Sequence, residues 1–224
     1  MLDLVGGGDT LAGEALSDLC EMYWYPLYAY ARRRGFGKDD AQDHTQEFFH
    51  RLLVRRDLEA ADRRKGRLRS YLLRAMQNFL TNVRRSEHAE CRGGGMVAIS
   101  IDAEDAETRY KLEPADADDP VRLFERRWAL TLLENVLAEM ERDFSSAGKS
   151  EQFAVLSPYI TVDGSEGSYA GAASKLGMKE GAVKVAVHRM RKRYRDLLYR
   201  HVAATVDSDE EVEEELRALM TAFR

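Results

Sequence analysis

Apolar residues recur at steps of three and four along most of this chain, and this spacing favours amphipathic helices over strands. The repeat is clear in segments 13–34, 38–55 and 68–87 and in the residues after Pro120. Only 4 prolines occur among 224 residues, so the commonest helix breaker is rare. Hydrophobic residues make up 44% of the chain, which is enough for packed cores. We therefore expect an all-α protein.

Charge is distributed in blocks that the net charge of -5 conceals. Segment 31–92 has 16 Lys and Arg against 9 Asp and Glu, and segment 175–200 has 9 against 2. Segment 102–119 holds 8 acids and 2 bases, and segment 207–215 holds 7 acids and no base. A solvated helix face explains any single block equally well. Two basic blocks separated by an acidic one favour two surfaces for an anionic partner and a linker that repels it.

These patterns divide the chain into five parts. We expect two small helical domains joined by an acidic linker, plus a short C-terminal helical tail. The predicted parts are a flexible N-terminus at 1–10, a first domain at 11–89, the linker at 90–120, a second domain at 121–203 and an acidic C-terminal extension at 204–224.

Segment 168–199 carries the most informative local pattern. Ala170, Ala173 and Leu176 give a short apolar helix, Gly177 permits a sharp turn, and a longer helix follows. The outward positions of that longer helix are polar and mostly basic: Glu180, Lys184, His188, Arg191 and Lys192. This layout is typical of a DNA-binding helix-turn-helix. A helical hairpin built only for packing has a similar composition and remains an alternative.

The helix predicted over 68–87 has an outer face without acids before Glu87. The side chains on this face either carry a positive charge or form hydrogen bonds: Ser70, Arg74, Gln77, Asn78, Thr81 and Arg85. Such a face is unusual in a chain with 39 Asp and Glu, and it indicates a polyanionic partner.

At these residues the sequence resembles sigma factors of the extracytoplasmic-function (ECF) type. Residues 15–85 look like sigma region 2, in which the run KDDAQDHTQEFFHRLL at 38–53 is similar to the helix that binds the polymerase clamp. Segment 65–78 is similar to the part that meets the -10 promoter element. Residues 121–199 look like region 4, and segment 180–191 matches its recognition helix for the -35 element. The runs YWYPLYAYARRRG and GAVKVAVHR also resemble a subgroup from planctomycetes and related bacteria.

The sequence departs from the family pattern at two positions. Gln42 stands where the clamp-binding helix usually has a third acid, and Lys179 stands where the recognition helix usually begins with Ser or Thr. Loss of that N-cap costs about 1 kcal/mol. The linker is also longer than in plain members of the family, and the residues after His201 form an additional tail.

The resemblance implies a protein that binds core RNA polymerase, at its clamp and flap regions, and directs sequence-specific promoter recognition and transcription initiation. It implies polymerase contacts at Asp39, Asp43, Gln46 and Glu47. It implies -10 DNA contacts at Arg67, Arg69, Tyr71, Arg74, Asn78, Asn82 and Arg85, where Tyr71 either stacks on a base or packs. It implies -35 DNA contacts at Lys179, Lys184, His188, Arg189, Arg191 and Lys192. Arg189 and Arg193 either touch phosphates or fix the helix to its domain.

No catalytic constellation, metal site or cofactor motif is predicted, so we do not expect an enzyme. Cys20 is predicted in a core and Cys91 in a loop, without paired spacing. The start of the chain lacks a signal-peptide pattern, and no apolar run is long enough for membrane insertion. We therefore expect a cytoplasmic bacterial protein. An anti-sigma factor or a regulatory kinase is left open as a partner.

Two other functions compete with this interpretation. A stand-alone helix-turn-helix regulator explains segment 168–199 but neither the acid-free helix nor the clamp-like run. An antagonist whose acidic tail mimics DNA conflicts with the two basic blocks.

The resemblance implies that the acidic linker occupies the positively charged path that nascent RNA later takes. The alternative is that its acidity keeps a flexible tether soluble and off DNA. The acidic tail is hypothesised to fold back on the basic recognition helix and mask it.

Overall fold

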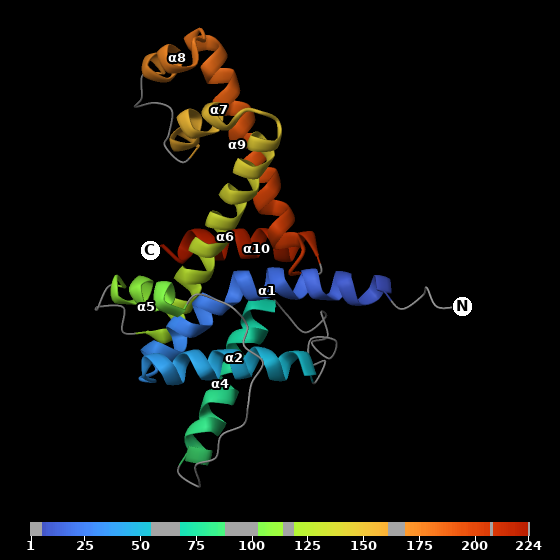
Figure 1. Cartoon of the computed structure of the whole chain (residues 1–224), viewed down its shortest axis with the longest axis vertical. Helices are drawn as coiled ribbons and strands as arrows, with labels where there is room; N and C mark the ends of the chain where they lie inside the picture. Colours follow the sequence, from blue (N-terminus) through green and yellow to red (C-terminus); the bar gives the residue numbers. More distant parts are fainter. Residues whose placement is uncertain are drawn as a thin grey trace. The chain divides into compact units, whose positions relative to one another are not determined.

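The computed structural model describes residues 6–54, 68–87, 103–113, 119–160, 169–206 and 208–223, and side chains are described there except at 6–19, 53–54, 86–87 and 103–105. These residues form helices and short connections, with no strand in the part described (Figure 1), as the sequence predicts. The helices are α1 Gly6–Arg33, α2 Lys38–Val54, α4 Leu68–Glu87, α5 Ala103–Lys111, α6 Pro120–Ser146, α7 Ser150–Leu156, η2 Ser157–Tyr159, α8 Ala170–Leu176, α9 Glu180–Ala203 and α10 Asp209–Thr221.

The chain forms two compact units. The first consists of Met1–Thr131 together with Thr205–Arg224, and the second is Leu132–Ala204. The helix α5, which lies in the predicted linker, and the helix α10, which lies in the predicted extension, both belong to the first unit.

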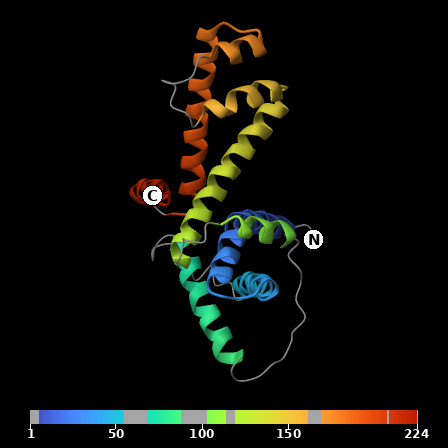
Figure 2. The same ribbon diagram turned by 90° about the vertical axis from the view of Figure 1, so that its left-hand side faces the viewer.

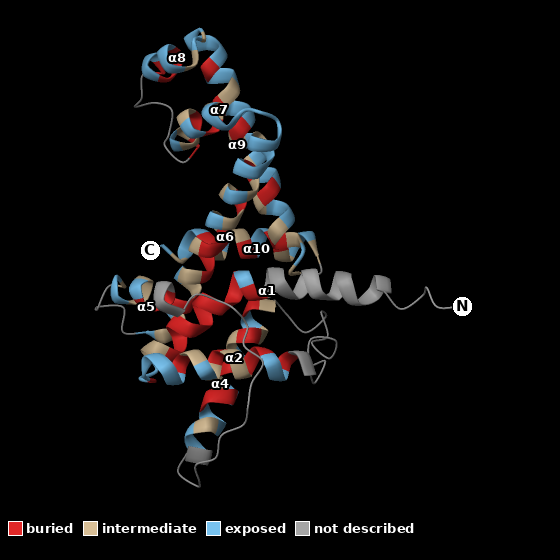
Figure 3. Cartoon of the chain, in the orientation of Figure 1, coloured by how far each residue is buried: buried red, intermediate tan, exposed pale blue. Residues whose placement is uncertain are grey.

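In the first unit, α1 packs against α2, α4 and α5. Part of α1 is buried, as its red colour in Figure 3 shows, and this part is rich in aromatic residues. Trp24 stacks on Tyr28 with ring centroids 5.3 Å apart. The helix continues through Pro26, where a bend or a local break was predicted, and it ends at Arg33. Gly35 follows with a φ of 93°, a left-handed conformation that favours glycine, so the predicted stop is confirmed.

Two segments are more ordered than their composition predicts. The glycine-rich start was expected to be flexible through residue 10, yet α1 begins at Gly6. The predicted linker contains α5, whose Glu107 binds side chains of α1. The Tyr28 hydroxyl donates to Glu107 Oε2 at 2.6 Å, and Arg32 pairs with the same carboxylate at 3.0 Å. A buried acid with two partners gives this acidic segment a fixed place on α1.

Electrostatics at this contact favour the ionised acid. Burial alone would raise the pKa of Glu107, but hydrogen bonds from Tyr28 and Arg32 outweigh it and lower the pKa. Cys20, also on α1, is buried as predicted, and burial raises the pKa of its thiol to about 11.

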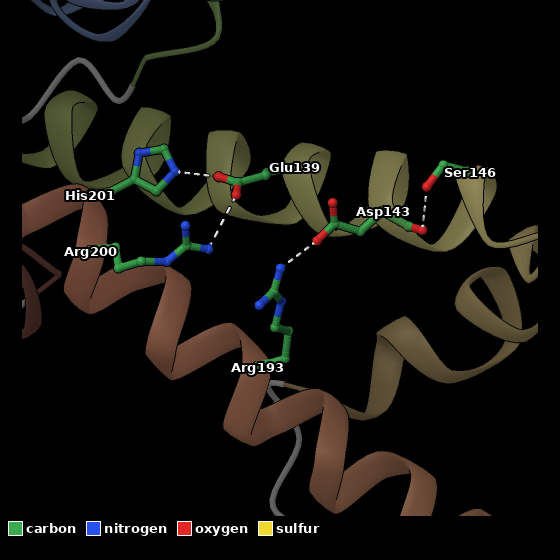
Figure 4. Close-up of polar contacts among 6 residues, drawn as sticks. All are labelled: Glu139, Asp143, Ser146, Arg193, Arg200 and His201. Carbon is green, nitrogen blue, oxygen red and sulfur yellow. Dashed lines mark hydrogen bonds and ion pairs between the residues drawn. The ribbon is translucent and has the colours of Figure 1, made fainter.

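The second unit is built on α9 and the part of α6 that follows Thr131; the two helices cross in the view of Figure 1 and diverge toward α7 and α8 in Figure 2. Ion pairs join the two helices (Figure 4). Glu139 faces Arg200 at 3.4 Å and His201 at 2.7 Å, and Asp143 binds Arg193 at 2.7 Å. The spacing of α9 predicts Val183, Val187, Met190 and Tyr194 on its inner side; the first three are buried and Tyr194 is half-buried.

The C-terminal helix α10 belongs to the first unit. Ser208 caps its start, because the Ser208 hydroxyl accepts a hydrogen bond from the Glu211 backbone N–H. Val212, Glu215 and Leu219 are buried, one turn apart on a single face. The buried acid pairs with Arg69 of α4, which belongs to the same unit.

Candidate polymerase and nucleic-acid interfaces

An acidic surface follows one side of α2. Asp39 and Asp43 are exposed one turn apart, and Gln46 and Glu47 beside them are half-buried. We call these four residues the acidic face of α2. The opposite side of the helix is buried through Ala41, Thr45, Phe48, Phe49 and Leu52. The apolar spacing therefore fixes which carboxylates point outward.

Two details of α2 bear on its chemistry. Glu47 pairs with Arg51 on the same helix, whereas Asp43 is exposed. The carboxylate of Asp43 is therefore more accessible than that of Glu47. Thr45 is fully buried and its hydroxyl donates to the Ala41 carbonyl at 2.7 Å, so it offers no accessible site for phosphorylation.

A second surface lies on α4. Arg74, Asn78, Asn82 and Arg85 are all exposed, and steps of four, four and three residues align them in one stripe. We call them the polar face of α4. Leu72, Met76 and Leu80 are buried on the other side. Two cations and two amides, the side-chain types that bind phosphates and base edges in nucleic-acid complexes, thus share an exposed face. Arg67 lies outside the described residues, and Tyr71 is half-buried.

Arg69 does not share this face. Steps of three and seven residues place it with Leu72 and Met76, and it is only 6% exposed. Its guanidinium lies 4.6 Å from the Trp128 ring centroid and pairs with Glu125 and Glu215. The sequence predicted Arg69 to be a DNA contact, whereas the structure shows it in a buried ion-pair cluster.

The second unit carries a helix-turn-helix formed by α8 and α9. Gly177 ends α8 with φ 61° and ψ 29°, the left-handed conformation that glycine adopts without strain. The backbone N–H of the next residue, Met178, donates a hydrogen bond to the Ala173 carbonyl of α8 at 2.9 Å. These bonds match a Schellman-type stop, and α9 begins three residues after the glycine. The turn predicted at Gly177 is therefore present.

The start of α9 presents a basic surface. Lys179, Lys184, His188, Arg189 and Lys192 are exposed, and we call them the recognition face of α9. Lys179 occupies the N-cap position without a side-chain capping bond, as its departure from the family pattern predicts. The Lys184 ammonium lies 6.0 Å from the Tyr169 ring centroid, at the far limit of a cation–π contact.

Two arginines of α9 hold the second unit together. Arg191 is half-buried, and its Nε and Nη2 donate to the Tyr159 carbonyl at 3.1 and 2.9 Å. Arg193 binds Asp143, and this hydrogen bond raises the pKa of the guanidinium. Arg191 was predicted to face outward and contact DNA, and its guanidinium instead braces η2. Arg193 takes the helix-fixing role, one of its two predicted alternatives.

One exposed residue of α9 was not singled out from the sequence. Val185 is 50% exposed and stands between Lys184 and the pair His188 and Arg189. An exposed β-branched side chain next to basic residues can contact the methyl group of thymine in a major groove. The signal was present in the sequence, because Val185 lies outside the apolar stripe formed by Val183 and Val187.

The described residues contain no cluster of three or more His, Cys, Asp or Glu that could hold a metal ion. Within the same residues, no helix combines the length and apolarity needed to cross a membrane.

An all-α chain with a helix-turn-helix in one unit, and separate acidic and cationic helix faces in the other, has the features of a DNA-binding transcription factor that also binds protein. Over 203 residues the chain is 27% identical to the ECF RNA polymerase sigma factor SigE of Mycolicibacterium smegmatis. The aligned region covers 90% of this chain and 68% of that protein. This similarity supports the ECF sigma-factor family and a role in transcription initiation at the level of that family. No protein-family model matches the chain. No solved structure matches it.

Proposed function

We propose that this chain is an ECF-type sigma factor that binds core RNA polymerase and directs it to specific promoters. The observation that carries the proposal is the combination within one chain of the helix-turn-helix α8–α9 with the faces of α2 and α4. The similarity to a sigma factor over 90% of the chain supports both parts together. A sigma factor needs all three surfaces, because it must hold polymerase and contact two promoter elements. Catalysis of RNA synthesis belongs to the polymerase.

The acidic face of α2 is proposed to bind basic groups on the polymerase clamp. Asp39 and Asp43 are exposed, so pairing with the clamp requires no rearrangement of the helix. Glu47 would have to exchange its partner Arg51 for a cation of the clamp. We therefore expect Asp39 and Asp43 to contribute more to binding than Glu47.

The polar face of α4 is proposed to hold the opened strand of the -10 element. Arg74 and Arg85 would bind phosphates, and Asn78 and Asn82 would bind base edges. Tyr71 is half-buried, which leaves part of its ring for a base to stack on. Such stacking contributes about 1–3 kcal/mol per base.

The recognition face of α9 is proposed to enter the major groove of the -35 element. Lys184 and His188 would reach base edges, Arg189 and Lys192 would touch phosphates, and Val185 would contact a thymine methyl. A good bidentate or direct base contact discriminates by about 1–3 kcal/mol. Lys179, at the open end of the helix, would meet a phosphate near the N-terminal dipole.

Several finer assignments rest on the sequence resemblance. They are membership of the planctomycete-like subgroup, contact of the second unit with the polymerase flap, and residence in a bacterial cytoplasm. An anti-sigma factor or a kinase that controls the protein belongs to the same group of proposals.

The decisive test is co-elution of the chain with bacterial core RNA polymerase in size-exclusion chromatography, beside the variant Asp43→Arg. We expect a stoichiometric complex with the intact chain and at least tenfold weaker binding with the variant. Glu141→Arg makes the same charge change at an exposed position of α6 and is the matched control, with binding expected to be unchanged. No complex with the intact chain would reject the proposal, and equal loss in both variants would reject the role of the acidic face.

A stand-alone helix-turn-helix regulator is the second candidate. It is favoured by α8–α9 alone, which forms a complete motif. It leaves the acidic face of α2 without a role. Tight, specific DNA binding by the free chain in the absence of polymerase would favour this candidate over the sigma factor.

A further inference from the structure

The C-terminal helix α10 is tied to the first unit by a buried two-point ion pair. Arg69 Nε donates to Glu215 Oε2 at 3.0 Å, and Arg69 Nη2 donates to Glu215 Oε1 at 3.1 Å. The side chain of Glu215 is 1% exposed and that of Arg69 is 7% exposed. This fork-to-fork geometry is the strongest arrangement available to a carboxylate and a guanidinium. A buried carboxylate on an acidic helix thus has a dedicated partner 146 residues earlier in the chain.

The surroundings of Arg69 form a socket with specific chemistry. Its guanidinium lies over the Trp128 ring at 4.6 Å, so one face of the cation is covered by an aromatic surface. Its third nitrogen, Nη1, donates to Glu125 at 3.0 Å, and that carboxylate is 41% exposed. Glu125 orients the guanidinium from the solvent side, and Glu215 fills the buried side. We call Arg69, Glu125 and Trp128 the Arg69 socket.

The sequence of α10 fits this socket in one register. Val212, Glu215 and Leu219 are spaced by three and four residues and are all buried, so the acid lies between two apolar anchors. Glu213 and Glu214 beside it are exposed, and Glu211 is half-buried. Glu215 is therefore the one acid of α10 that is buried.

We infer that α10 is a separable latch: it docks on the first unit by inserting Glu215 into the Arg69 socket, and the socket is a binding site for the carboxylate of an acidic amphipathic helix. The occupant is the C-terminal extension of the same chain. The helix α10 thereby controls the surroundings of the first turn of α4. The inference goes beyond the proposed function, and its test needs neither polymerase nor DNA.

Hydrogen–deuterium exchange of the full chain tests the latch. Glu215→Gln keeps the shape of the side chain and removes its charge, so we expect exchange of the α10 amides to rise at least tenfold while α2 and α9 remain protected. Glu213→Gln removes a charge from an exposed neighbour that pairs with Arg217 on the same helix, and it should leave exchange of α10 within twofold. Slow exchange of α10 in Glu215→Gln, or equal acceleration in both variants, would overturn the inference.

A second variant covers the case in which Glu215→Gln unfolds the whole unit. Arg69→Lys keeps the positive charge but loses the two-point geometry. Faster exchange confined to α10 in this variant supports a separable latch. Equal acceleration in α2 and α10 would overturn it, because the helix would then be an inseparable part of the core.

A labelled peptide of residues 207–224, added to the Glu215→Gln chain, should bind the vacated socket. The same peptide with Glu215→Gln should bind at least tenfold more weakly. Equal binding of the two peptides also contradicts the inference.

Discussion

Arg191 uses two guanidinium nitrogens on a single backbone oxygen, that of Tyr159, and this contact has a measurable consequence for stability. In Arg191→Ala the carbonyl of Tyr159 loses both donors, and the alkyl part of the arginine no longer packs. A lost hydrogen bond to a charged group costs about 1.5–3 kcal/mol. We expect a decrease of that size in the free energy of unfolding of the second unit, measured by urea denaturation.

Lys192→Ala is the control for this change, because Lys192 is exposed on the adjacent position of α9. It should change the free energy of unfolding by less than about 0.5 kcal/mol. If Arg191→Ala were as stable as the wild type and altered only the preference for -35 sequences, the original prediction of a base contact would be supported instead.

Arg69 and Arg191 show what the sequence could not supply at the scale of one residue. Both were predicted as DNA contacts because an arginine in a basic segment has the same appearance whether it binds phosphate or protein. Their partners are a carboxylate 146 residues away and a backbone oxygen 32 residues away. The helical position of Arg69, three residues before buried Leu72, was the available clue, and it indicated burial.

The first turn of α9 is the place where a single substitution can most easily change the stability of a helix. Lys179 occupies the N-cap with extended backbone angles, φ -73° and ψ 144°, and makes no side-chain capping bond. A serine at this position could accept a hydrogen bond from a backbone N–H of the first turn. We expect Lys179→Ser to stabilise the second unit by about 1 kcal/mol in thermal or urea unfolding. It should also weaken DNA binding through the lost cation.

Lys179→Ala separates the two effects, because it removes the cation without providing a cap. It should weaken DNA binding as much as the serine variant does, with no gain in stability. A serine variant no more stable than the alanine variant would show that the first turn of α9 does not require a cap.

The docking of α5 should depend on pH through Glu107. Its pKa lies below the usual 4.5, so the ionised acid stabilises the docked state above the usual pKa, and this stability is lost as the pH falls through the lowered pKa. We expect exchange of the α5 amides to accelerate below about pH 4.5. Glu107→Gln, which cannot ionise, should show faster exchange already at pH 7 and little further change on acidification. An identical pH profile in both proteins would contradict this role.

The limits of the helices could be predicted best from the sequence, and the contacts between helices could be predicted least. The predicted limits of the segments 38–55 and 68–87 agree with α2 and α4 to within one residue, because apolar periodicity and local end signals define them. The helix α5 was missed within a stretch read as an acidic tether. Its place depends on Tyr28 and Arg32, more than 70 residues earlier, and no local pattern reports such a contact.

The whole chain carries a net charge of -5 although both of its proposed DNA-binding faces are basic. Long-range attraction to DNA is therefore weak for the free protein, and the acids of the linker and of α10 oppose it. A sigma factor can tolerate this, because polymerase supplies most of the binding to the promoter. The charge distribution of the whole molecule thus favours the sigma factor over the stand-alone regulator.

We expect the free chain to bind any promoter fragment weakly, and the complex with core polymerase to bind its own promoter at least 100-fold more tightly, as measured by fluorescence anisotropy at fixed salt. Within that complex, Arg189→Ala should reduce the slope of log affinity against log salt by about 1 without changing sequence preference, as a phosphate contact does. Val185→Ala should instead weaken binding only where a thymine faces α9, because the methyl contact has no ionic component. Salt-sensitive, sequence-specific binding by the free chain that polymerase does not strengthen would mean that α8–α9 acts alone, and the protein would then be a helix-turn-helix regulator.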